Sequence, residues 1–214
     1  MLEQALETTN KGLQVNDYTL YAKSVLKGRF REEVNVDIWI KKGDNETNLM
    51  FLKVFYGRPP YYKPWVEFFN IKEHVKIGNK TIDYFGSAFE DGLLQFFAQY
   101  IGPGENIFVE YDNDRETKKQ LEVGFPSPVT RLGYKLFNLG FTWFKDWYFP
   151  EGFMEGDQKL QGEKPLNEES KAHHLEEISS HVKNFLERTT EGSADWYMNG
   201  ALQRAKRILE MLKS

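Results

Sequence analysis

Alternating apolar and polar residues predict a β-sheet in the first half of the chain. Residues 33–41 alternate strictly, and one face carries the side chains of Val34, Val36, Ile38 and Ile40. A period of two over this length predicts a half-buried strand. We expect neighbouring strands over residues 18–26 and 48–56, with a turn at KKGDNET where Gly, Asp and Asn accept the required dihedrals. The first half is therefore predicted to be an antiparallel meander.

Further extended segments are expected over residues 65–70, 80–85, 106–111 and 141–149. Apolar residues recur at helical spacing in residues 88–101, with Ser87 as the expected cap, and a second helix is expected to start at Ser127-Pro128 and stop at Gly140. Gly133 lies on the apolar stripe of that helix, where it permits close packing.

Two amphipathic helices are predicted to close the chain, over residues 168–188 and 194–213, as an antiparallel hairpin. Residues 2–13 favour a further short helix. This order predicts an α+β fold with a mostly antiparallel sheet and helices on its faces. The expected divisions are an α+β domain over 1–150, a glycine-rich, charged connection over 151–166 and the helical hairpin over 167–214, packed on the same domain.

Composition narrows the class of protein. The chain has 214 residues, a formal net charge of −4, 15% aromatic residues and no cysteine. No basic stripe indicates nucleic acid as a partner, and the absence of cysteine excludes disulfides, thiolate metal sites and a Cys nucleophile. The apolar runs are too short to span a bilayer and the N-terminus does not resemble a signal peptide. We expect a cytoplasmic protein that contacts neither nucleic acid nor membrane.

Glu110 is the first candidate for chemistry. It lies in NIFVEYDND, at the end of a predicted strand. Burial at a cleft would raise its pKa and suit it to act as a general base, whereas an ion pair with Lys or Arg would make it structural. Residues 112–114 follow the strand, where they either line a site or form an ordinary turn.

Four other groups of polar or aromatic residues are candidates for a site, and each also has a purely structural interpretation. The carboxylates of residues 151–163 match no known metal-binding loop, and His173, Glu177 and His181 share a solvated helix face, so no metal is expected. Aromatic residues around the prolines of 56–65 form either a lid over a pocket or a cover for a sheet edge. Trp196 either anchors a dimer or packs on its own domain.

One long segment resembles a known family. FVEYDNDRET (108–117) and residues 130–165 are similar to an uncharacterised, largely archaeal domain-of-unknown-function family that is grouped with the GNAT superfamily of N-acetyltransferases. LFNLGF (136–141) resembles a helix-ending signature of that superfamily. The resemblance implies a GNAT-like mixed sheet flanked by helices.

The resemblance also implies a reaction: transfer of an acyl group from acetyl-CoA, as substrate, to an amine or other small molecule. Backbone N–H groups of Gly86, Ser87 and Ala88 would hold the coenzyme at a helix start, although this turn lacks the superfamily's basic residue and second glycine and has carboxylates after it. An alternative register places the phosphate loop at 124–133 and uses Arg131.

In this reaction Glu110 would be the base, and Tyr111 or Tyr134 would protonate the leaving thiolate. The alternative is a non-catalytic ligand-binding module on the same fold that forms a homodimer.

Overall fold

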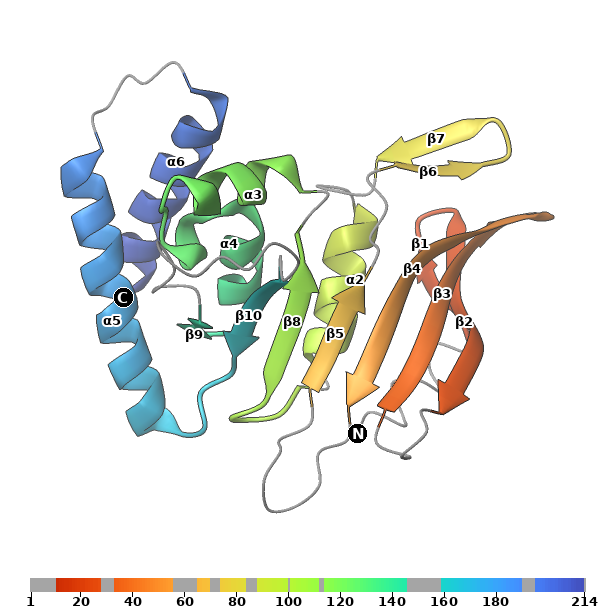
Figure 1. Ribbon diagram of the computed structural model, residues 1–214, viewed down its shortest axis with the longest axis horizontal. Helices are drawn as coiled ribbons and strands as arrows, with labels where there is room; N and C mark the ends of the chain where they lie inside the picture. The colour runs from red at the N-terminus through yellow and green to blue at the C-terminus, as the bar shows by residue number, and fades with distance from the viewer. Residues whose placement is uncertain are drawn as a thin grey trace. The chain divides into compact units, whose positions relative to one another are not determined.

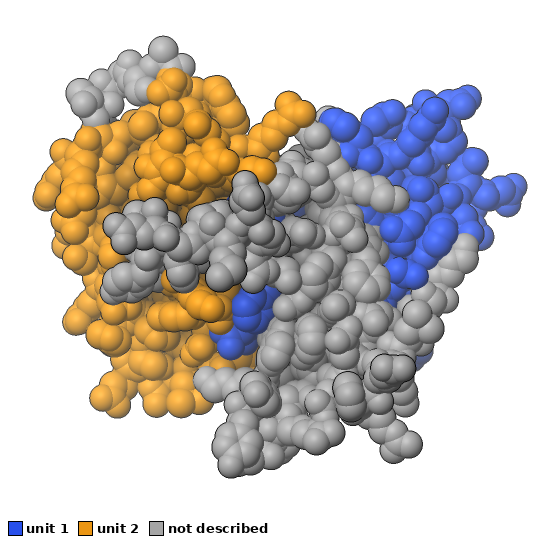
Figure 2. Space-filling view, viewed as in Figure 1, with its two compact units in different colours: residues 1–102, 106–113 blue, residues 103–105, 114–214 orange. Residues whose placement is uncertain are grey.

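The computed structural model describes residues 11–27, 33–55, 65–69, 74–83, 88–99, 101–111, 114–145, 159–189 and 195–213. Residues 23–27, 33–35, 50–55, 65–69, 83, 110 and 159 are described by their backbone alone. The chain divides into two compact units (Figure 2). Unit 1 comprises residues 1–102 and 106–113, and unit 2 comprises residues 103–105 and 114–214. The sequence-based divisions at 150 and 166 do not coincide with this one.

Unit 1 contains a mixed sheet with strand order β1-β2-β3-β4-β5-β8 (Figure 1). Its strands are β1 (Leu13–Val15), β2 (Tyr18–Lys27), β3 (Glu33–Lys42), β4 (Asn45–Phe55), β5 (Trp65–Phe69) and β8 (Asn106–Glu110). Neighbours from β1 to β5 are antiparallel, which confirms the predicted meander, while β5 and β8 are parallel. A separate antiparallel hairpin is made of β6 (His74–Ile77) and β7 (Lys80–Asp83).

The core of unit 1 follows the predicted pattern. Val36, Ile38 and Ile40 are fully buried on one face of β3. Helix α2 (Ala88–Ala98) lies where the 3.6-residue periodicity predicts a helix and buries Leu93 and Phe97. Strand β6 was not predicted, because it is short and its four residues bury only Val75 and Ile77.

Unit 2 is mainly helical. It contains α3 (Arg115–Glu122), the 3₁₀ turn η1 (Ser127–Val129), α4 (Arg131–Asn138), α5 (Glu168–Arg188) and α6 (Trp196–Met211), together with the antiparallel strands β9 (Trp143–Phe144) and β10 (Lys159–Glu163). Helices α5 and α6 pack together, which confirms the predicted hairpin. None of the described helices has the length and hydropathy needed to cross a membrane.

Unit 2 holds one helix that was not predicted, and two local predictions for this unit are wrong. Helix α3 was not predicted, because its buried positions are the polar Thr117 and Gln120. Strand β10 lies in the segment expected to be an irregular connection. Thr130, not Ser127, caps α4, because the intervening residues form the separate turn η1.

Candidate functional site

The topology of unit 1 brings two predicted site segments to one edge of the sheet. Strand β5 ends at Phe69, the chain enters α2 at Ala88, and β8 then runs parallel to β5, with pairing from Trp65↔Asn106 to Phe68↔Val109. Since a helix that joins two parallel strands runs antiparallel to both, the start of α2 and the end of β8 lie at the same edge (Figure 1). Such edges are where α/β sheets bind ligands.

The structure places the predicted residues of unit 1 as follows. Ala88 is the first residue of α2 and is exposed, while Gly86 and Ser87 lie outside the described residues. Glu110 ends β8, and only its backbone is described. Tyr111 follows it, with its side chain 2% exposed. Ala88 and the Glu110 backbone are thus at one edge, and the Tyr111 ring is in the core.

The first turn of α2 is acidic. Glu90 is 1% exposed and Asp91 is exposed. Carboxylates at a helix N-terminus interact favourably with the helix dipole. They also repel an anionic ligand at the same place, so the charge of this turn opposes binding of a diphosphate.

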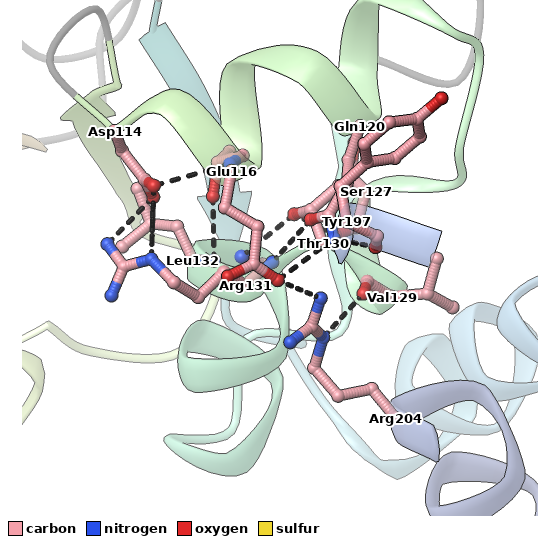
Figure 3. Close-up of polar contacts among 12 residues, drawn as sticks. Asp114, Glu116, Gln120, Ser127, Val129, Thr130, Arg131, Leu132, Tyr197 and Arg204 are labelled. Carbon is pink, nitrogen blue, oxygen red and sulfur yellow. Dashed lines mark hydrogen bonds and ion pairs between the residues drawn. The ribbon is translucent and has the colours of Figure 1, made fainter. Parts of the chain in front are cut away.

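Unit 2 holds a cluster of polar side chains that was not predicted from the sequence. We call this set the Asp114 cluster (Figure 3). It comprises Asp114, Glu116, Thr117, Gln120, Thr130, Arg131 and Arg204. Its members come from α3, α4, α6 and the residues that cap α3 and α4. The sequence does carry a signal for the start of α3. Asp is a favoured N-cap residue, and Asp114 stands directly before RETKKQLE, which has a Glu in its first turn.

Asp114 and Arg131 form a buried ion pair. The Arg131 Nε atom lies 3.1 and 3.0 Å from the two carboxylate oxygens of Asp114, and one terminal nitrogen lies 2.7 Å from Oδ2. The side chains are 3% exposed for Asp114 and 13% for Arg131. Asp114 also caps α3 by accepting a hydrogen bond from the Thr117 N–H at 3.3 Å. The Arg131 guanidinium is therefore engaged by a carboxylate of its own unit.

The first four backbone N–H groups of a helix have no acceptor within the helix, and at the N-terminus of α4 each of the four has an acceptor outside that ladder. The acceptors are Ser127 O for the N–H of Thr130, Gln120 Oε1 for Arg131, Thr117 Oγ1 for Leu132 and Thr130 Oγ1 for Gly133. Because these donors are already used, α4 offers a phosphate no free backbone N–H. The alternative register, with a phosphate loop at 124–133, stays a prediction that these contacts disfavour.

The Asp114 cluster also ties α6 to α3 and η1. Gln120 donates to the carbonyl of Tyr197 at 2.8 Å and to Glu116 at 3.0 Å. Arg204 of α6 donates to the Val129 carbonyl at 2.7 Å and pairs with Glu116 at 2.8 Å. Three helices and one turn of unit 2 thus share a single set of polar contacts.

Ser127 and Gly133 show how tightly η1 packs on α4. The Ser127 side chain is 1% exposed, and its Oγ atom has no hydrogen-bond partner among the residues that the structure describes. A Cβ atom at Gly133 would lie 1.8 Å from the Ser127 carbonyl oxygen. The predicted close approach at Gly133 is confirmed, and its partner is the backbone of η1.

The remaining candidates do not join a site among the described residues. Tyr134 lies on α4 with its side chain half-buried. His173 Nε2 lies 3.5 Å from Glu177 Oε1, but the described residues contain no group of three or more His, Asp or Glu side chains able to hold a metal. Residues 112–113, 151–158 and most of 56–65, including the expected lid, lie outside the described residues.

Comparison with known proteins gives a family and a structural neighbour. A family described as a protein of unknown function (DUF1122) matches residues 16–189. The crystal structure of a protein of unknown function from Aquifex aeolicus VF5 is 34% identical to this chain, with a TM-score of 0.77, and the alignment covers 100% of this chain and 98% of that one. A search of curated proteins finds no match.

Proposed function

The chain belongs to the family of proteins of unknown function DUF1122, and we propose that it is a GNAT-like N-acyltransferase that uses an acyl-CoA as donor. One observation carries the proposal: an antiparallel meander leads into the parallel strands β5 and β8, which α2 connects. This arrangement supports a GNAT-like fold because it brings a helix start and a strand end to the same edge of a mixed sheet.

The proposed site belongs to unit 1. Backbone N–H groups at residues 86–88, together with the dipole of α2, would meet the phosphates and the thioester of acetyl-CoA. Glu110 would remove a proton from the attacking amine, whose nitrogen forms a bond to the acyl carbon as the carbon–sulfur bond breaks. Tyr111 would return a proton to the thiolate if its ring leaves the core. Arg131 and Tyr134 belong to unit 2 and are not included.

A rival function has its own support. The buried Glu90 and exposed Asp91 place carboxylates in the first turn of α2, where a coenzyme diphosphate would lie. This charge favours a non-catalytic module on the same fold, which binds another ligand or forms a homodimer.

Thermal unfolding with and without acetyl-CoA distinguishes the two. A ligand at about 100 times its Kd stabilises the folded state by about 2.7 kcal/mol, which raises the Tm of a chain of this size by about 5–10 °C. Ala88→Glu should abolish the shift by adding a carboxylate at the start of α2. Gln203→Glu, the same charge change at an exposed position of α6, should keep it. An unchanged Tm in millimolar acetyl-CoA would support the rival.

Catalysis needs a separate test. In Glu110→Gln the coenzyme-dependent Tm shift should persist, while thiol release with a panel of primary amines should fall by about 10²–10⁴-fold. Equal rates for the variant and the natural protein would remove Glu110 from the proposed mechanism.

A further inference from the structure

A histidine of α5 contacts the residue that precedes β9 in unit 2. The Nδ1 atom of His174 lies 3.1 Å from the Oγ1 atom of Thr142. Thr142 is 5% exposed, and its backbone N–H donates to the Glu163 carbonyl at 3.0 Å, next to the β9–β10 pairing of Trp143 with Glu163. The contact therefore joins the N-terminal turns of α5 to the end of a strand pair.

The groups around His174 shift the pKa of its imidazole in opposite directions. Its ring is half-buried, and burial is the largest influence, lowering its pKa below the ordinary value of 6.5. Glu163, from β10, and Glu177, on α5, favour the protonated ring, while His173 opposes it. The net direction is toward the neutral imidazole.

The Thr142 hydroxyl adds a geometric reason for the same preference. A neutral ring that carries its proton on Nε2 accepts the hydroxyl proton at Nδ1. In the protonated ring both nitrogens are donors, so the Thr142 oxygen must accept and its own proton needs another acceptor. Within a site as enclosed as that of Thr142, a donor without an acceptor is costly.

We propose that Thr142 and His174 form a pH-dependent clamp, which holds the start of α5 on the β9–β10 pair while the imidazole is neutral and releases it when the imidazole is protonated. At acidic pH the N-terminal turns of α5 would then detach from the β9–β10 pair, and the rest of unit 2 would stay folded.

Hydrogen exchange of the full chain, corrected for the intrinsic pH dependence of exchange, tests the clamp at about pH 5 and about pH 7.5, on either side of the ordinary histidine titration. Protection of residues 168–177 should be lower at the acidic pH, by up to about tenfold for each unit by which the pKa of His174 lies below 6.5. Protection of the α3 and α4 amides should be the same at both pH values.

Three variants make the test specific. His174→Gln should remove the pH response, and His173→Gln, a matched change at the exposed neighbour, should keep it. Thr142→Val, which replaces the hydroxyl with a methyl group of similar size, should lower protection at about pH 7.5 to the acidic value. A pH response that persists in His174→Gln, or a His174 pKa at or above 6.5 by NMR titration, would overturn the proposal.

Discussion

Removal of the Asp114 carboxylate should be among the most destabilising single changes in unit 2. In Asp114→Ala the guanidinium of Arg131, 13% exposed, loses three contacts of 2.7–3.1 Å to a carboxylate that is 3% exposed. Breaking a buried pair by removing one partner costs about 3–5 kcal/mol, because the buried charge that remains loses this compensation. Loss of the α3 cap adds about 1 kcal/mol.

We expect Asp114→Ala to lower the free energy of unfolding by about 4 kcal/mol. This is less than the sum of the largest pair and cap costs, because Arg131 retains some access to water and its charge is partly screened. Asp114→Asn separates the two roles. Asparagine caps a helix about as well as aspartate, so this variant should keep the cap, lose the ion pair and be about 1 kcal/mol less destabilised.

Urea unfolding of the full chain, followed by circular dichroism and by exchange of the α3 and α4 amides, measures these differences. The double variant Asp114→Asn/Arg131→Met should be less destabilised than the sum of its single variants, because it removes the carboxylate charge and the guanidinium charge together. A loss below about 1 kcal/mol for Asp114→Ala, as for a surface pair, or strict additivity in the double variant, would show that Asp114 and Arg131 do not stabilise unit 2 as a buried ion pair.

Further changes test the packing around the cluster. Gly133→Ala should destabilise by about 3 kcal/mol or more in thermal melts, because its Cβ would meet the Ser127 carbonyl at 1.8 Å and backbone must move. Ser127→Ala should be neutral or stabilising by up to about 1 kcal/mol, because it removes a buried hydroxyl that finds no hydrogen-bond partner in the described part of the chain; a clear loss of stability would mean that the hydroxyl is hydrogen-bonded. Gln120→Met should cost about 1–3 kcal/mol in urea melts by leaving the Arg131 N–H and the Tyr197 carbonyl without this partner. Because the pKa of His174 is lowered on folding, the unfolded chain binds its proton first, so the free energy of unfolding should fall as pH decreases below about 6.5, and this slope should flatten in His174→Gln.

Much of the fold could be predicted because its signals are periodic. Alternation in β3 and helical spacing in α2, α5 and α6 all reflect one apolar face against a core. Helix α3 was not predicted because its buried side chains, Thr117 and Gln120, are polar and form hydrogen bonds within unit 2. The pattern of apolar residues has no signal for positions of that kind.

The candidate site could be predicted less well. A cation beside a helix start suggests phosphate binding, and on this ground Arg131 was a candidate. The structure pairs it with Asp114, which is 17 residues earlier in the chain, and such a pairing depends on how α3 and α4 pack. Ala88 and Glu110 lie at one edge of the sheet because β5 and β8 are parallel. The alternation of apolar and polar residues predicts a strand but not the direction in which it pairs with its neighbour.

The proposed function requires that unit 1 binds an acyl-CoA at the start of α2. Chemical-shift mapping of the backbone amides during titration with acetyl-CoA, up to about 1 mM, detects this binding residue by residue. We expect saturable shifts at Ala88 and the following turn and at the end of β8. Absence of shifts at this concentration, or shifts confined to the start of α4, would contradict it.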